Sequence, residues 1–354
     1  MLLTSQICIR KNLVHVGCRV LVLYIEMLQD LAKFPLYRLP LLAFQGVIKS
    51  MEFDVMFFFS LTSPKAKTML KISLPKNYLH LDCTLGYFKK ITIESPSSNN
   101  KFAFEFRNTV PNGGGSFQHQ NVQLRYFRDL NQSIEICGKE TLVVMIRELI
   151  THLAESLHLP KISMDFLSLI APEEALELLK HVNSLSLPMV GIDLESQNTT
   201  VKIYKAFLDE GSRISKSLIM GCRAPVDFQY TPSEDFHLEK FVVHDGFWVK
   251  LEDYANCKCV IIRSISESRS VYSVNAQSLN QFFKIWQKSS CRLERFVLSV
   301  HHSHGLNFDN ITMGLNGTNI TRFGFASSMD IERQDGKKAT ITLTGLFAKL
   351  EIKS

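Results

Sequence analysis

The hydrophobic pattern of residues 34–74 predicts three short helices that follow one another closely. Pro40 fits a first helical position, because its missing N–H costs nothing there. Apolar residues then recur at helical spacing, at Leu41, Phe44, Ile48 and Met51. The first helix is therefore expected to start at Pro40.

Two further helix starts are predicted from capping residues in the same segment. Asp54 is the expected N-cap of a second helix that ends at Leu61, and Ser63 before Pro64 is expected to start a third. Helices this short cannot bury the run 57–59 of three phenylalanines by themselves. We expect a partner or a following domain to cover that run.

Residues 75–120 are expected to form a polar link with short strands. Turn-forming stretches at 95–101 and 111–116 flank an alternating run that places Phe102, Phe104 and Phe106 on one face of a strand. This pattern predicts a small sheet or a hairpin. The glycine run at 113–115 lacks the strand-then-helix setting of a phosphate-binding loop and is expected to be a hairpin tip.

From about residue 139 onwards, helical and strand patterns alternate. Amphipathic helices are predicted within 140–157, 172–185 and 276–289, and strands within 161–169, 187–194, 239–245, 257–264 and 292–300. Such alternation favours an α/β layer of mainly parallel strands. Several spacings approach those of a leucine-rich repeat. The predicted fold class is therefore α/β, with an N-terminal three-helix unit followed by an irregular, leucine-rich-repeat-like βα module.

Composition and charge narrow the function classes. Hydrophobic residues at 45% and charged residues at 21% are typical of a globular chain, and no apolar run is long enough for a membrane span. The net charge of +6 is carried by residues 1–80, so the rest of the chain lacks the basic stripe of a nucleic-acid binder. We expect neither nucleic acid nor membrane as a partner.

The cysteines and histidines offer little chemistry. The eight cysteines are spread over the chain and are expected to be reduced thiols, as in a cytoplasmic or nuclear protein. Cys257 and Cys259 have the wrong spacing for a zinc knuckle, even with the cluster His301, His302 and His304 further on. No catalytic signature is present, so we predict no enzyme activity, no metal and no cofactor.

One residue group, on the helix predicted at 276–289, has two interpretations. Phe282, Phe283, Ile285 and Trp286 could line a target pocket. Their helical spacing favours core packing instead.

The segment 34–71 resembles an F-box, whose pattern is Leu-Pro, an apolar helix, and an apolar stretch ending in a Leu/Ser-rich turn and a basic helix. The matching residues are Leu39, Pro40, Val47, Ile48, Met51, Ser60, Leu61, Ser63 and Lys65. The stretches 278–300 and 329–341 are similar to the helix-strand unit and terminal strand of the type 2 F-box-associated domain. The chain thus resembles an F-box protein with a C-terminal F-box-associated domain.

The resemblance implies a substrate-receptor subunit of an SCF-type ubiquitin ligase. Its F-box would bind a Skp-type adaptor and, through it, a cullin, while the C-terminal domain would hold an unknown protein target. The adaptor-binding residues implied are Leu36, Leu39, Pro40, Val47, Ile48, Met51 and Leu61. Lys65, Lys67 and Lys71 are expected on a solvated face.

The expected organisation has four parts: a leader of unknown role at 1–33, an F-box at 34–74, the polar link at 75–120 and an F-box-associated substrate-recognition domain at 121–354. An alternative function remains open from the residues alone. The chain could be a repeat-like protein-binding scaffold with no ligase role.

Overall fold

The fold is described by a computed structural model covering residues 39–352. Within that span the description leaves out residues 77, 96–97, 108–114, 120–121, 129–132, 159, 168–169, 196–198, 264–273, 300–305 and 345–346. The expected leader, the candidate residue Leu36 and the cluster His301, His302 and His304 lie outside the described residues. None of the described helices combines the length and the apolar character needed to cross a membrane.

The described part of the chain begins with the three short helices α2 (Leu41–Ser50), α3 (Phe53–Thr62) and α4 (Pro64–Ser73). The start of α4 is as predicted, because the Ser63 side chain accepts a hydrogen bond from the Ala66 N–H ahead of a first-turn proline. The prediction of Asp54 as N-cap of α3 is wrong. Glu52 is the N-cap, and Asp54 lies buried in the first turn, where its Oδ1 accepts from the Val55 N–H at 2.8 Å.

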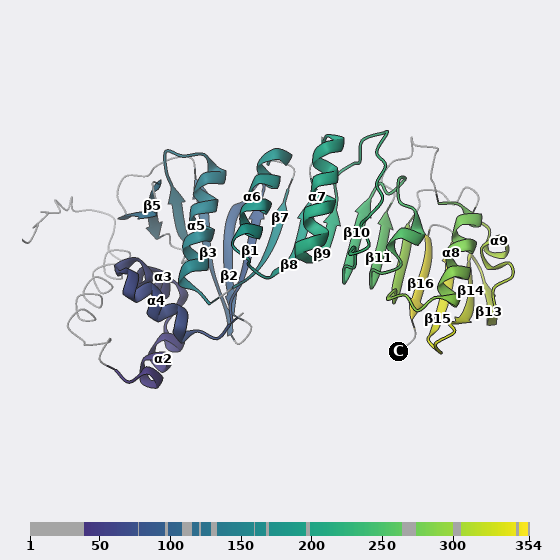
Figure 1. Ribbon diagram of the computed structural model, residues 1–354, viewed down its shortest axis with the longest axis horizontal. Coiled ribbons are helices and arrows are strands. Elements are labelled where there is room, and N and C mark those ends of the chain that lie inside the picture. The colour runs from purple at the N-terminus through teal and green to yellow at the C-terminus, as the bar shows by residue number, and fades with distance from the viewer. Residues whose placement is uncertain are drawn as a thin grey trace, which may run out of the picture.

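A single 16-stranded sheet runs through the rest of the described chain, from purple-blue to yellow in Figure 1. Its strands are β1 (His80–Leu85), β2 (Lys89–Ser95), β3 (Ser98–Arg107), β4 (Gly115–His119), β5 (Val122–Arg128), β6 (Ile134–Cys137), β7 (Lys161–Phe166), β8 (Met189–Leu194), β9 (Ser215–Met220), β10 (Lys240–His244), β11 (Cys259–Arg263), β12 (Arg295–Ser299), β13 (Gly317–Phe323), β14 (Ala326–Glu332), β15 (Lys338–Thr344) and β16 (Phe347–Ile352). The spatial order is β13-β14-β15-β16-β12-β11-β10-β9-β8-β7-β1-β2-β3-β6-β5-β4.

The centre of this sheet is parallel and its flanks are largely antiparallel. β1 pairs in parallel with β7, and β7 to β12 then follow one another in chain order, each parallel to the next. Beyond β12 all strand pairs are antiparallel. The expectation of mainly parallel strands therefore holds for the centre only. The predicted α/β class is confirmed as a mixed α/β fold.

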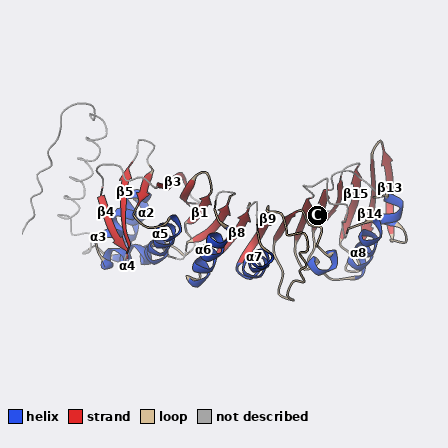
Figure 2. Cartoon of the chain, turned by 90° about the horizontal axis from the view of Figure 1, so that it is seen from above, coloured by secondary structure: helices blue, strands red, loops and turns tan. Residues whose placement is uncertain are grey.

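The helices α5 (Leu142–Ser156), α6 (Pro172–Ser184), α7 (Val201–Ile214) and α8 (Ala276–Lys288) line up along one face of the sheet (Figure 2). Two shorter pieces are the 3₁₀ helix η2 (Leu251–Tyr254) and α9 (Phe308–Thr312). Strand side chains alternate between faces, so every second residue is buried beneath the helices. In β7, for example, Ile162, Met164 and Phe166 are buried, while Ser163 and Asp165 face the other way.

The three N-terminal helices share the core of the sheet. Phe57 of α3 packs edge-on against Phe104 of β3, with ring centroids 4.8 Å apart, and lies 5.7 Å from the ring of His152 on α5. Phe57 is buried and Phe59 nearly so, while Phe58 is half-buried. The expectation that following elements cover this run is confirmed. The strands of the predicted link, β1 to β4, belong to the same sheet as the later strands.

Candidate functional site

The candidate site is the outer surface of α2 and α4. Leu41 and Leu42 open α2 and are 52% and 82% exposed, and Ile72 near the end of α4 is 50% exposed. The Gln45 Nε2 donates to the Ile72 carbonyl oxygen at 3.4 Å, which brings the two helices together. Because Leu41 and Leu42 precede Gln45 by four and three positions, all three lie on one side of α2. We call Leu41, Leu42 and Ile72 the apolar patch.

The residues predicted to bind an adaptor divide into inner and outer positions. Ile48 is fully buried, so it holds α2 against the core and offers no outer surface. Pro40 is exposed. Four others are partly buried and pack against the core, at Leu39, Val47, Met51 and Leu61.

The most exposed residues of the apolar patch were not among the predicted ones. A simple sequence signal would have pointed to Leu42 alone, because it precedes Phe44 by two positions and Ile48 by six and so lies off the face that these two residues bury. Leu41 shares the helical spacing of Phe44 and Ile48, yet it is 52% exposed at the first position of α2. Ile72 has no such signal, because its exposure depends on how α4 packs against α2.

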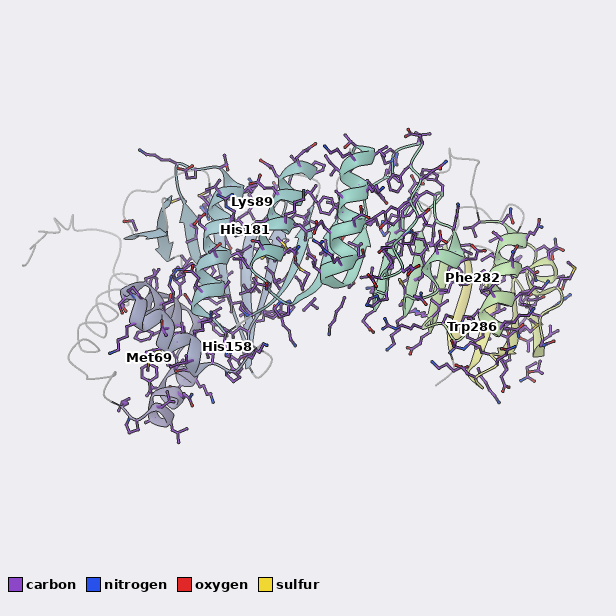
Figure 3. All side chains as sticks on the ribbon, in the orientation of Figure 1. Met69, Lys89, His158, His181, Phe282 and Trp286 are labelled. Carbon is purple, nitrogen blue, oxygen red and sulfur yellow. The ribbon has the colours of Figure 1, made fainter. Side chains whose placement is uncertain are left out.

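Hydrogen bonds join the helices that carry the patch to the rest of the protein. Ser60 on α3 is hydrogen-bonded to His152 on α5 at 2.8 Å, and both side chains are buried. His158 beyond α5 has its Nδ1 3.2 Å from the Leu74 carbonyl oxygen, next to the end of α4, which carries Met69 (Figure 3). These contacts tie α3 and the end of α4 to α5 and the residues after it, and the Gln45–Ile72 hydrogen bond ties α2 to α4.

The basic residues of α4 have separate roles. Lys67 forms an ion pair with Glu155 of α5 at 2.7 Å, so the prediction of a solvated face is wrong for this residue. Lys67 tethers α4 to α5, although a half-exposed pair of this kind contributes little to stability. Lys65 is exposed and Lys71 half-buried, beside the apolar patch residue Ile72.

The α8 group is part of the core. Phe282, Phe283 and Trp286 are each at most 2% exposed, and the Trp286 Nε1 donates to the Leu293 carbonyl at 3.3 Å. Figure 3 shows Phe282 and Trp286 on α8 in the C-terminal part of the sheet. Core packing is therefore confirmed as the interpretation of these residues. Only Ile285 of this group has an exposed side chain, at 38%.

The thiols of the buried cysteines pack in the core. Burial raises the pKa of Cys257 to about 11 and raises the pKa of Cys83 well above its usual range, so both thiols stay protonated. Cys257 precedes β11 and is fully buried, whereas Cys259 is half-buried. The described part of the chain contains no group of three or more His, Cys, Asp or Glu side chains suited to a metal ion.

A comparison with protein families matches one region of the chain. Residues 234–298 match the family model described as F-box associated, a region that includes β10, η2, β11, α8 and most of β12. No F-box family model matches residues 34–74. Neither a curated protein nor a solved structure matches the chain. The C-terminal half of this protein therefore carries an F-box-associated region.

Proposed function

We propose that this protein is a non-catalytic substrate-receptor subunit of an SCF-type ubiquitin ligase. The observation that carries the proposal is the F-box-associated match at residues 234–298, since this region is named for its association with F-boxes. The three N-terminal helices that precede it act as the F-box and bind a Skp-type adaptor, and through it a cullin. The protein works in the cytoplasm or the nucleus.

The apolar patch supports this assignment. Three large aliphatic side chains on one small helical unit are exposed together, and such patches mark protein interaction sites. The leading contact residues are Leu41, Leu42 and Ile72, with Leu39 and Pro40 beside them. Ile48 supports them from within.

The mechanism is proximity. The chain holds a target close to the ubiquitin-charged enzyme, which raises the effective concentration of the target lysine without chemistry by this chain. The parallel strands β7 to β12, which succeed one another in chain order, support a leucine-rich-repeat-like curve as the target-holding part.

The test is capture of a purified Skp-type adaptor by the full chain. Leu42→Asp should weaken capture by about tenfold or more, because it places a charge in an apolar contact. The control is Val226→Asp, which puts the same charge on a 77% exposed valine remote in sequence from α2. Equal capture by both variants would contradict the docking surface.

The alternative is a repeat-like scaffold without a ligase. The absence of an F-box family match at residues 34–74 favours it. The same experiment separates the two functions, because a scaffold of this kind would leave the adaptor in the unbound fraction even with the native chain.

A further inference from the structure

Between β1 and β12 the sheet has a second face that none of the described helices covers. Helices α5 to α8 all lie on the opposite side of the strands (Figure 2). Strand register places one side chain from each central strand in a single row across this face, in the order Thr84, Asp165, Asp193, Ile219, Val242, Ile261 and Val297. We call the surface formed by this row and its neighbours between β1 and β12 the helix-free face.

Four of the seven residues in this row are aliphatic. Ile219, Val242, Ile261 and Val297 come from four neighbouring strands and stand side by side. Ile219, Ile261 and Val297 are half-buried although no described helix covers them, and Val242 between them is buried. A β-branched row left at the surface of a sheet offers apolar area to a partner.

Two of the other three residues in the row are acidic. Asp165 on β7 and Asp193 on β8 are register partners. Asp82 on β1 is two residues before Thr84, and Glu195 is two residues after Asp193, so both share the face of the row. These carboxylates repel one another: burial and then the charges of Asp82 and Glu195 raise the pKa of Asp165. Among these four residues, the Asp193 Oδ1 is buried without a hydrogen-bond partner in the described structure, and Lys240 of β10 offsets only part of the repulsion at Asp193.

A second row of residues, two positions nearer the amino ends of the strands, leaves room for a ligand beside Asp165 and Asp193. Ser163, Gly191 and Ser217 follow one another across β7, β8 and β9, so the residues next to Asp165 and Asp193 in this direction are small. Lys240 of β10 follows Ser217 in the same row, and the His80 Nε2 lies 2.8 Å from the Ser163 hydroxyl at the other end. A long basic side chain can therefore lie flat on the sheet and reach the carboxylates.

We propose that the helix-free face is where this protein holds its target, and that it takes a target segment in which Lys or Arg residues lie beside aliphatic ones. The proposal rests on the proposed function and names the chemical class of the target. A cation bound at Asp165 and Asp193 removes their mutual repulsion, which a neutral or acidic segment cannot do. Aliphatic residues of the same segment cover Ile219, Ile261 and Val297 and bury them.

The experiment measures binding of the full chain to immobilised peptides that combine Lys or Arg with Val, Ile or Leu. A matched set replaces each basic residue with Glu. The full chain should bind the basic set at least about tenfold more tightly, and the difference should shrink as salt is raised towards 1 M, where screening acts within about 3 Å. Equal binding to both sets overturns the proposal.

Two double variants locate the binding. Asp165→Asn with Asp193→Asn should lower affinity for the basic set about tenfold or more, and should leave the fold intact because it relieves a repulsion. Glu173→Gln with Glu174→Gln is the control, since it removes the same charge from the exposed first turn of α6, on the helical side. An equal loss in both variants means that net charge, not this face, attracts the peptide.

Adaptor capture measured on the same samples keeps the two proposals apart. Peptide binding without adaptor capture contradicts the ligase role and leaves the target face standing. Adaptor capture with no preference for basic peptides contradicts the target face and leaves the ligase role standing. A further variant, Ile219→Thr with Ile261→Thr, should also weaken binding, and an unchanged affinity would remove the aliphatic residues from the proposal.

Discussion

Ser60 of α3 and His152 of α5 meet in the interior of the protein, with the Ser60 Oγ 2.8 Å from the His152 Nε2. The two residues are 92 positions apart in the sequence and both are at most 3% exposed. Ser60 also donates to the Phe57 carbonyl at 2.6 Å, and the His152 ring packs against the Phe57 ring. Through this contact, the N-terminal helices and the sheet belong to one packed unit.

The first prediction concerns the strength of this contact. Ser60→Ala should lower the free energy of unfolding by about 1–3 kcal/mol, because it removes a buried partner of the imidazole. Ser50→Ala is the control, since the Ser50 hydroxyl bonds to the Val47 carbonyl at the exposed end of α2. Urea unfolding of both variants measures the difference, and equal midpoints and slopes would show that the buried contact adds nothing.

The second prediction concerns the separation of the chain into fragments. A fragment of residues 39–74 should show no cooperative thermal transition by itself, since it exposes Phe57, which the whole chain buries against Phe104 and His152. A fragment that starts at residue 121 loses β1, β2 and β3, and with them the parallel partners of β7 and β6. It should unfold at a lower temperature than the chain from residue 39.

Calorimetry of the three fragments checks this prediction. The fragment from residue 121 could instead melt as sharply as the chain from residue 39 and at the same temperature. In that case, the division predicted between residues 120 and 121 also separates independent folding units.

The local elements could largely be predicted because their signals are local. The Ser63-Pro64 start of α4 and the alternation of β3 depend on neighbouring residues alone. Helix α7 is an exception, because the sequence prediction did not include it. Tyr204, Phe207, Leu208 and Gly211 recur at helical spacing and are buried, yet this helix and the strand β9 after it were not among the predicted elements.

The candidate site was harder to predict, because exposure depends on tertiary packing. Ile48 and Leu42 are both aliphatic residues of the same helix, but one is fully buried and the other is 82% exposed. A family pattern marks both as apolar and does not say which of them faces outward. Ile72 is exposed because of how α4 packs on α2, a contact between residues 27 positions apart.

The third prediction concerns a buried arginine near the C-terminus. The Arg333 Nη1 donates to the Cys291 carbonyl at 2.6 Å, its Nε and Nη2 donate to the two Asp335 carboxylate oxygens, and its Cζ lies 5.4 Å from the Trp286 ring. Lysine cannot reproduce this planar fork. Arg333→Lys should therefore lower the free energy of unfolding by about 1–3 kcal/mol.

Arg322→Lys is the matched control for this change. Arg322 pairs with Asp309, but both side chains are more than 60% exposed, so the same substitution should change stability by about 0.5 kcal/mol or less. Similar effects of the two substitutions in urea unfolding would contradict a special role for the Arg333 fork.

The last prediction follows from the carboxylates of the helix-free face. Burial, and then the charges of Asp165 and Glu195, raise the pKa of Asp193 from 3.8 to about 6, against a smaller opposing effect of Lys240. Between these two values the folded chain binds more protons at this site than the unfolded chain. The Asp193 contribution to the free energy of unfolding therefore falls as pH rises from about 4 to about 6 and stays low above that.

Asp193→Asn should remove this penalty. The variant should be more stable than the native chain at about pH 8, by about 1 kcal/mol once solvent screening of a half-buried group is allowed for, and should show no gain at about pH 4. Asp227→Asn, at an exposed loop position, is the control and should give no pH-dependent gain. Urea unfolding across this pH range is the measurement. A gain that is the same at both ends of the range would mean that the carboxylate repulsion is absent and that asparagine simply packs better beside Gly221 and Asp165.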